Sequence, residues 1–296
     1  MIRGPGITLV PGAFNAFLAK LVENYGFPAV YVSGSGTSMT LLGRPDVGLV
    51  TLNEMVMNVR YICQTVEIPV ISDADTGYGN AVNVTRTVRD FIEAGAAAIH
   101  IEDQEMPKKC GHYSGKTLVS RDEMVGKLRA AVDTRDKYDP DFVVIARTDA
   151  RGASGGGFDE AITRANLYAE AGADMIFADG LVSEDEVVSL PRRVRAPVMA
   201  NMVEGGLTPL HSADELGAMG YRLVIFPNSL VRLMQRAASE LLDDLKKAGS
   251  TKAFLDRMTL FPGPHELVGL SDFKRLEKKY VPEEVLAAKY AGSLGA

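Results

Sequence analysis

The feature that most constrains the fold is a unit of roughly 30 residues that recurs along the chain. Each unit ends a helical pattern near a glycine and then continues into a short apolar segment. Residues 93–103 (EAGAAAIHIED) and 170–179 (EAGADMIFAD) show this most clearly. Glycine suits the left-handed position that ends a helix, and a short apolar run bounded in this way is typical of a buried parallel strand. The chain is therefore expected to alternate helices and strands.

Eight such segments are predicted as strands: 7–10, 29–33, 68–73, 97–102, 142–147, 175–179, 196–201 and 222–226. Because helical patterns separate them, right-handed crossovers would join them into a parallel sheet. Four of these helices are expected to begin with a capping box, at Thr51/Glu54, Ser120/Glu123, Ser183/Glu186 and Ser212/Glu215. Eight units favour an α/β fold of the closed (β/α)8 type, a TIM barrel, over an open sheet.

The C-terminal part of the sequence is helical only. Helical patterns cover 229–248, 250–258, 264–275 and 282–291. The first supplies the eighth helix of the barrel or replaces it, and the others exceed what a minimal barrel needs. We expect them to cover a neighbouring subunit; a helical cap on the same chain is the alternative. With no linker or low-complexity tract, residues 1–296 are interpreted as a single barrel domain, in which 229–296 close the barrel and form oligomer contacts.

Composition excludes several classes of protein. The net charge is −6 and the acidic and basic residues are interspersed, which argues against a nucleic-acid or membrane partner. No apolar run approaches the roughly 18 residues that span a bilayer, and residues 1–6 lack the apolar core of a signal peptide. The two cysteines, Cys63 and Cys110, do not indicate a disulfide framework, and Cys63 is expected to be a small buried hydrophobic side chain in a helix. A cytoplasmic location follows as the expectation.

Polar residues gather where the predicted strands end, which is where the active site of a (β/α)8 barrel forms. Asp73 and Asp75 have strand spacing, so their carboxylates lie on the same side, and Glu102 at the end of the next strand can join them. Like charges so close together require a cation between them. Hard oxygen ligands without His or Cys select Mg²⁺, with Mn²⁺ also possible. The alternative is a set of structural carboxylates paired with Arg147 and with lysines.

Two further features suit an acidic substrate. Arg147, at the end of the fifth strand, presents a planar fork that binds a carboxylate bidentately; a salt bridge to Asp149 or Glu102 is the alternative. Residues 33–36 (SGSG) follow the second strand, and their backbone amides could hold a carboxylate or a phosphate.

Residues 104–119 form a long polar loop with Lys108-Lys-Cys-Gly-His112 at its centre. Nearby positive charge favours the thiolate of Cys110, Gly111 lets the backbone approach a ligand, and His112 could orient the thiolate or bind the substrate. Loops of this length in compact domains are usually functional. A lid that carries the proton donor would complete the site on closing and exclude water. A surface loop with an incidental cysteine is the alternative.

At these residues the chain resembles the isocitrate lyase/phosphoenolpyruvate mutase superfamily, from about Pro11 to Arg236. The resemblance rests on six motifs: 31–36 (YVSGSG), 43–46 (GRPD), 73–79 (DADTGYG), 100–104 (HIEDQ), 108–112 (KKCGH) and 146–149 (ARTD). It implies a barrel whose last helix swaps between subunits, usually in a homotetramer. The cysteine in the KKCGH motif is similar to that of the lyase branch, which cleaves 2-methylisocitrate or 2-alkylmalates.

The resemblance also implies roles for individual residues. Asp73, Asp75 and Glu102 serve Mg²⁺, with Asp46 in its outer shell. Cys110 is the general acid, and Lys108 and Arg147 complete the catalytic set with Tyr31, our candidate for the base. The substrate, a small 2-hydroxy carboxylate, is expected to contact Ser33, Gly34, Ser35, Gly111, His112, Arg147, Asp179, Asn201 and Arg232.

Two departures from the resemblance bear on the substrate. Residues 177–180 read FADG where 2-methylisocitrate lyases have FPEA, so Asp179 replaces a longer Glu. The arginine that those enzymes use for an extra carboxylate has no clear counterpart near 261–266. Both differences favour a smaller 2-hydroxy diacid.

The predicted reaction is a retro-aldol cleavage of a 2-hydroxy di- or tricarboxylate, of the 2-methylisocitrate or 2,3-dimethylmalate type. Its products are a keto acid such as pyruvate and a carboxylic acid. Hydrolysis or decarboxylation of oxaloacetate at the same site is the alternative. Mutase chemistry on phosphonopyruvate or carboxyphosphonoenolpyruvate is disfavoured by Cys110, and a non-catalytic barrel would require broken site residues.

Overall fold

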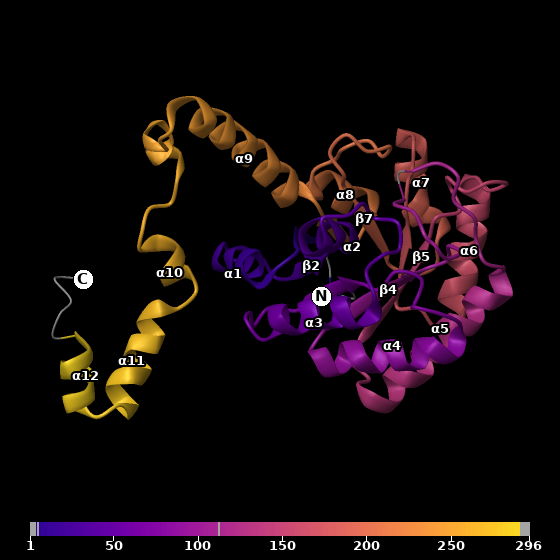
Figure 1. Cartoon of the computed structure of the whole chain (residues 1–296). Coiled ribbons are helices and arrows are strands. Elements are labelled where there is room, and N and C mark those ends of the chain that lie inside the picture. The colour runs from indigo at the N-terminus through magenta and orange to yellow at the C-terminus, as the bar shows by residue number, and fades with distance from the viewer. Residues whose placement is uncertain (1–3, 5, 112, 291–296) are drawn as a thin grey trace. The chain divides into compact units, whose positions relative to one another are not determined.

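The computed structural model describes residues 4, 6–111 and 113–290 (Figure 1). Its core is a closed barrel of eight parallel strands in sequence order, in which β8 pairs with β1 through Thr8 opposite Leu223. The strands are β1 (Thr8–Ala13), β2 (Val30–Val32), β3 (Val70–Asp73), β4 (Ala98–Glu102), β5 (Val143–Thr148), β6 (Met175–Ala178), β7 (Val198–Asn201) and β8 (Leu223–Phe226). The predicted (β/α)8 barrel is confirmed.

Helices separate successive strands and surround the barrel in Figure 1. They are α1 (Ala16–Asn24), α2 (Gly34–Thr37), the π-helix η1 (Ser38–Leu42), α3 (Leu52–Cys63), α4 (Ala81–Ala94), α5 (Arg121–Tyr138), α6 (Phe158–Glu170), α7 (Glu184–Arg193) and α8 (Ala213–Met219). Side chains of buried residues pack in two layers. One fills the barrel interior, with Tyr31, Phe177 and Met199 among its members, and the other lies between strands and helices.

The predicted capping boxes form in part. The boxes at Thr51/Glu54 and Ser212/Glu215 are reciprocal, as expected. Ser120 and Ser183 accept from the backbone N–H of Glu123 and Glu186. The carboxylate of Glu186, however, binds Arg151 and the backbone N–H of Val182, so this box is not reciprocal: the guanidinium offers a stronger, charge-assisted partner.

The chain divides into two compact units, residues 1–235 and 236–296, and helix α9 (Ser229–Ala248) crosses the division. The second unit continues with the 3₁₀ helix η2 (Lys252–Arg257), α10 (Gly263–Leu267), α11 (Leu270–Tyr280) and α12 (Glu283–Tyr290). No residue from 236 to 289 is buried. The single-domain assignment and the helix swap remain predictions. Among the described residues, no helix has both the length and the apolarity needed to cross a membrane.

Candidate active site

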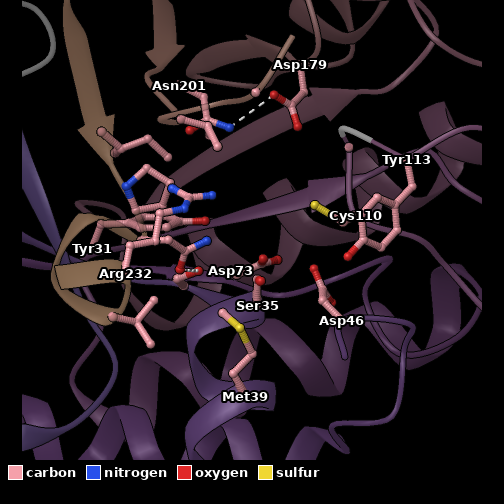
Figure 2. Close-up of a pocket in the computed structure, with 18 of the residues that line it drawn as sticks. Tyr31, Ser35, Met39, Asp46, Asp73, Cys110, Tyr113, Asp179, Asn201 and Arg232 are labelled. Carbon is pink, nitrogen blue, oxygen red and sulfur yellow. Dashed lines mark hydrogen bonds between the residues drawn. The ribbon is translucent and has the colours of Figure 1, made fainter. Parts of the chain in front are cut away.

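The carboxyl ends of the strands surround a cavity of about 340 Å³ (Figure 2). In this view the sulfur of Cys110 lies on the side of Tyr113 and Asp46, with Tyr31 and Arg232 across the cavity. The predicted site residues that line it are Tyr31, Ser33, Ser35, Asp46, Asp73, Cys110, Gly111, Arg147, Asp179, Asn201 and Arg232. Four further predicted site residues are buried but do not line the cavity: Gly34, Asp75, Glu102 and Lys108. His112 lies outside the described residues.

The turn after β2 is built around Ser33, the N-cap of α2. Its hydroxyl accepts from the N–H of Gly36 (3.1 Å) and donates to Asn228 Oδ1 (3.0 Å). The N–H of Gly34 donates to Asp73 Oδ2 (3.3 Å), and a Cβ at Gly34 would lie 2.5 Å from that oxygen. In this structure, therefore, the turn holds the Asp73 carboxylate. Asn228 was missed by the sequence analysis, although it follows the end of β8 and the strand-end rule could have found it.

Lys108 lies among the carboxylates that were predicted to hold a metal. Its Nζ is 2.6 Å from Asp46 Oδ1 and 2.7 Å from Asp75 Oδ1. Burial is the largest influence on Asp75 and raises the pKa of its carboxyl to about 6, against the opposing effect of the ammonium. The backbone of Asp75 has a φ of +46°, and its N–H donates to Asp73 Oδ1 (2.9 Å). A left-handed backbone at a non-glycine residue is typical of functional sites.

The described residues contain no group of three or more His, Cys, Asp or Glu side chains already placed to hold a metal ion. The predicted ligands are instead divided: Asp46 and Asp75 contact Lys108, and Glu102 lies beside Arg147, whose Nε is 3.2 Å from Glu102 Oε2.

Glu102 nevertheless retains coordinating capacity. Both carboxylate oxygens are buried, and neither accepts a hydrogen bond within the described part of the chain. Burial raises the pKa of this carboxyl well above its ordinary value. Buried oxygens without hydrogen bonds require an explanation in a native protein, and a hard divalent cation is a fitting one. The donor set of Asp73, Asp75 and Glu102 thus suits Mg²⁺.

Tyr31 is paired with a buried histidine of β4, His100. The phenol oxygen and His100 Nε2 are 2.7 Å apart, and the two rings stack. Burial, followed by the charge of Asp73, raises the pKa of Tyr31 well above its ordinary value. Burial also lowers the pKa of His100 to about 4. The resting pair is therefore a phenol beside a neutral imidazole, and Tyr31 needs such a partner if it is to transfer a proton.

Arg147 lines the cavity and also forms the salt bridges that were the alternative considered from the sequence, so its role in binding a substrate carboxylate stays a prediction. Its Nε and Nη2 lie 2.9 and 3.1 Å from the two oxygens of Asp149, and Nη2 is 2.8 Å from Asp179 Oδ2. The guanidinium stacks over Phe177 at 5.0 Å. Its charge lowers the pKa of Asp149 against the effect of burial, which is the largest influence. The fork is thus rigidly oriented, and a bound carboxylate has to share it.

Residues 104–111 and 113–119, which we call the flap, bring Cys110 to the cavity. Gln104 fixes its central part because its side-chain amide donates to the carbonyl of Lys109 (2.8 Å) and accepts from that residue's N–H (2.9 Å). Gly111 fits closely: a Cβ there would overlap the Asp179 carboxylate and lie 2.6 Å from Arg147 Nη2. Only glycine allows the flap to approach these groups so closely.

Two polar pairs complete the lining. Asn201 Nδ2 donates to Asp179 Oδ1 (3.1 Å), as Figure 2 shows. Arg232 pairs with Glu204, with Nη1 and Oε2 2.7 Å apart. Glu204 was not predicted from the sequence, because it lies in a loop beyond the end of β7.

Comparison with known proteins places these residues in a wider context. The model of a family described as phosphoenolpyruvate phosphomutase matches residues 2–246. A 2,3-dimethylmalate lyase from Eubacterium barkeri is 46% identical over 93% of this chain and 93% of that protein. A 2-methylisocitrate lyase from Aeropyrum pernix is 45% identical over 97% and 92%.

Three solved structures are also similar to this chain. The crystal structure of a 2,3-dimethylmalate lyase, a member of the PEP mutase/isocitrate lyase superfamily, has a TM-score of 0.91 at 34% identity over 100% of this chain and 96% of that one. Oxaloacetate acetylhydrolase bound to 3,3-difluorooxalacetate scores 0.88 at 35% identity, with 93% and 92% covered. Phosphonopyruvate hydrolase in complex with oxalate and Mg²⁺ scores 0.83 at 32% identity, with 93% and 95% covered.

Proposed function

Because the chain belongs to the PEP mutase/isocitrate lyase superfamily, we propose that it is a carbon–carbon lyase that cleaves a 2-hydroxy diacid by a retro-aldol reaction. The observation that carries the proposal is the position of Cys110, which lines the same cavity as Tyr31 and Asp73. A thiol beside a site for an acidic substrate can protonate a carbanion. The two similar curated relatives are both named as lyases.

The charges at the cavity favour a dicarboxylate over a tricarboxylate. Among the described residues that line it, Arg147 and Arg232 are the only Arg or Lys side chains, and each already pairs with at least one carboxylate. A third substrate carboxylate would therefore meet no additional cation. Apolar side chains that could contact alkyl substituents also line the cavity, namely Met39, Val203, Ile225 and Val231. This combination fits a 2-alkylmalate such as 2,3-dimethylmalate.

The proposed cofactor is Mg²⁺, with Mn²⁺ as a substitute, and Asp73, Asp75, Glu102 and Asp46 are the residues that would hold it. Support comes from the buried oxygens of Glu102 and from the relative solved with oxalate and Mg²⁺. When bound, the ion lowers the pKa of a coordinated hydroxyl as a Lewis acid and neutralises charge. Lys108, which contacts two of these carboxylates, has to give up at least part of that pairing.

The side chains divide the remaining work. Arg147 and the amides that follow Ser33 orient the carboxylate next to the hydroxyl-bearing carbon. Tyr31 passes its phenol proton to His100 Nε2 and accepts the hydroxyl proton of the substrate as the bond between carbons 2 and 3 breaks. The electron pair of that bond moves to carbon 3, where the neighbouring carboxylate delocalises it. Cys110 then gives its S–H proton to that carbon, so that the products are a keto acid and a saturated carboxylic acid.

A panel of 2-hydroxy acids tests this proposal. Wild-type protein with Mg²⁺ is assayed on 2,3-dimethylmalate, 2-methylisocitrate, oxaloacetate and phosphonopyruvate, with lactate dehydrogenase reporting pyruvate and oxalate measured separately. We expect the highest kcat/KM for 2,3-dimethylmalate. Faster release of oxalate from oxaloacetate would favour the hydrolase alternative, which neither of the two curated relatives supports.

The assembly is also part of the proposal. In the four helical segments after residue 250, no side chain that the structure describes, up to residue 289, is buried. Apolar side chains such as Phe273 (64% exposed) and Tyr280 (69%) remain accessible. Exposed apolar surface of this kind marks subunit contacts. A homotetramer with exchanged C-terminal helices, located in the cytoplasm, is the proposed form, with no nucleic-acid or membrane partner.

A further inference from the structure

The flap contains a second buried lysine, Lys116, that the proposed chemistry does not use. Only 1% of its side chain is exposed. Its ammonium donates to the carbonyl of Gly111 and lies 3.3 Å from Asp149 Oδ1. Burying an ammonium is costly unless it is paired and hydrogen-bonded. Lys116 meets both conditions by joining the flap to the end of β5.

The group that Lys116 contacts on the barrel is itself rigidly held. Asp149 is fully buried and accepts from Nε and Nη2 of Arg147 at 2.9 and 3.1 Å. The backbone N–H of Asp149 donates to Asp103 Oδ1 (3.0 Å), and Asp103 Oδ2 accepts from the hydroxyl of Tyr168 (2.7 Å). Asp149 therefore offers Lys116 a fixed point, and it does so while also orienting Arg147.

The base of the flap is fixed at Lys116 as well. The carbonyl of Lys116 accepts from the N–H of Ser154 (3.1 Å), and Lys116 forms a parallel bridge with Ala153. Lys109, in the same flap, differs in its exposure and in its hydrogen-bond partner. It is exposed, and its ammonium donates to the carbonyl of Gly115 (2.8 Å), a residue of the flap itself. Lys116 thus ties the flap to the barrel, whereas the side chain of Lys109 does not.

From these contacts we infer that Lys116 is a positioning residue for the proton donor: it fixes the Gly111 carbonyl to Asp149 and thereby sets the place of the adjacent Cys110 thiol. The inference rests on the proposed lyase function. Because the Asp149 carboxylate contacts both Lys116 and Arg147, the same side chain holds the flap and orients the guanidinium that is proposed to bind the substrate. A displacement of about 1 Å in such an arrangement costs on the order of 10²-fold in rate.

The test compares Lys116→Met with the matched control Lys109→Met. Steady-state kinetics on 2,3-dimethylmalate are expected to show a fall in kcat of roughly 100-fold for Lys116→Met, with KM changed far less. Lys109→Met removes a charge beside Cys110 without releasing the flap, so its effect on kcat should be much smaller. Iodoacetamide modification, followed separately at Cys110 and Cys63 by peptide mass spectrometry, supplies a readout that needs no turnover. The rate at Cys110 should change several-fold more in Lys116→Met than in Lys109→Met.

Lys116→Gln, which removes the charge but keeps a donor, is the second variant in case Lys116→Met does not fold, and urea unfolding checks both. Wild-type kcat and a wild-type modification rate at Cys110 in either folded variant overturn the inference. The inference is also overturned if Lys109→Met changes kcat and the modification rate at Cys110 as much as Lys116→Met does. If the wild-type protein releases no keto acid from any 2-hydroxy acid, the proposed function fails, but the comparison of modification rates still decides the role of Lys116.

Discussion

Replacing Gly111 with alanine is expected to impair the reaction by moving the flap, with little effect on folding. A Cβ at this position would lie 2.6 Å from Arg147 Nη2 and 2.9 Å from Asp179 Cγ, whereas ordinary contacts begin at 3.4 Å. Relieving these overlaps requires a shift of about 1 Å, and a shift of that size near the reacting groups costs on the order of 10²-fold in rate. Because Cys110 is the neighbouring residue, its sulfur moves with the backbone.

The assay measures kcat/KM for 2,3-dimethylmalate in Gly111→Ala and in the control Gly126→Ala. Gly126 lies within α5, and the nearest atom to its added Cβ is 4.0 Å away, so alanine there should be neutral or stabilise by about 0.5–1 kcal/mol. We expect a loss of roughly 100-fold in Gly111→Ala and none in Gly126→Ala, with both proteins unfolding at similar urea concentrations. Wild-type kcat/KM in Gly111→Ala would refute the close fit of the flap on which the argument depends.

The other predictions concern the thiol, the metal, the buried histidine and the assembly. Cys110→Ser should lose at least about 10²-fold in kcat, while isothermal titration calorimetry should still detect binding of the keto acid. Wild-type turnover in this variant would remove Cys110 from the mechanism. EDTA should abolish activity and Mg²⁺ should restore it, and full activity in chelator would exclude a metal role. His100 has a folded-state pKa of about 4, below its unfolded value, so its contribution to stability is complete at neutral pH and declines as the pH falls toward 4. In metal-free protein, urea unfolding should therefore show a flatter pH dependence for His100→Gln, by up to about 1.4 kcal/mol per pH unit, and equal slopes would contradict this. Sedimentation velocity should show a tetramer, and a monomer at micromolar concentration would contradict the exchanged C-terminal helices.

The fold could be predicted from the sequence because its signals are local. Four strands, β2, β4, β6 and β8, are apolar runs that follow a glycine at or just beyond the end of a helix, namely Gly26, Gly95, Gly172 and Gly220. The observed strands differ from the predicted ones only at their ends: 7–10 became Thr8–Ala13, and 196–201 became Val198–Asn201. The residues that line the cavity could also be predicted from the sequence, because barrel geometry brings the strand ends together whatever the intervening sequence.

The contacts between side chains within the site could not be predicted from the sequence. Lys108 reaches Asp46 and Asp75, and Lys116 reaches Asp149, through a flap whose path has no periodic pattern. The partnership of Tyr31 with His100 depends on two strands whose side chains meet inside the barrel. Contacts of this kind are set by tertiary packing, and sequence spacing does not encode them.

The most direct test of the central claim is to follow the cleavage of 2,3-dimethylmalate in D₂O by proton NMR, with Mg²⁺ present. The mechanism predicts pyruvate and propionate in equal amounts, with one deuterium at carbon 2 of propionate delivered from the Cys110 thiol. Little or no product should form with Cys110→Ser. Rapid formation of the same labelled propionate by Cys110→Ser, or no pyruvate from the wild-type protein, would contradict the account.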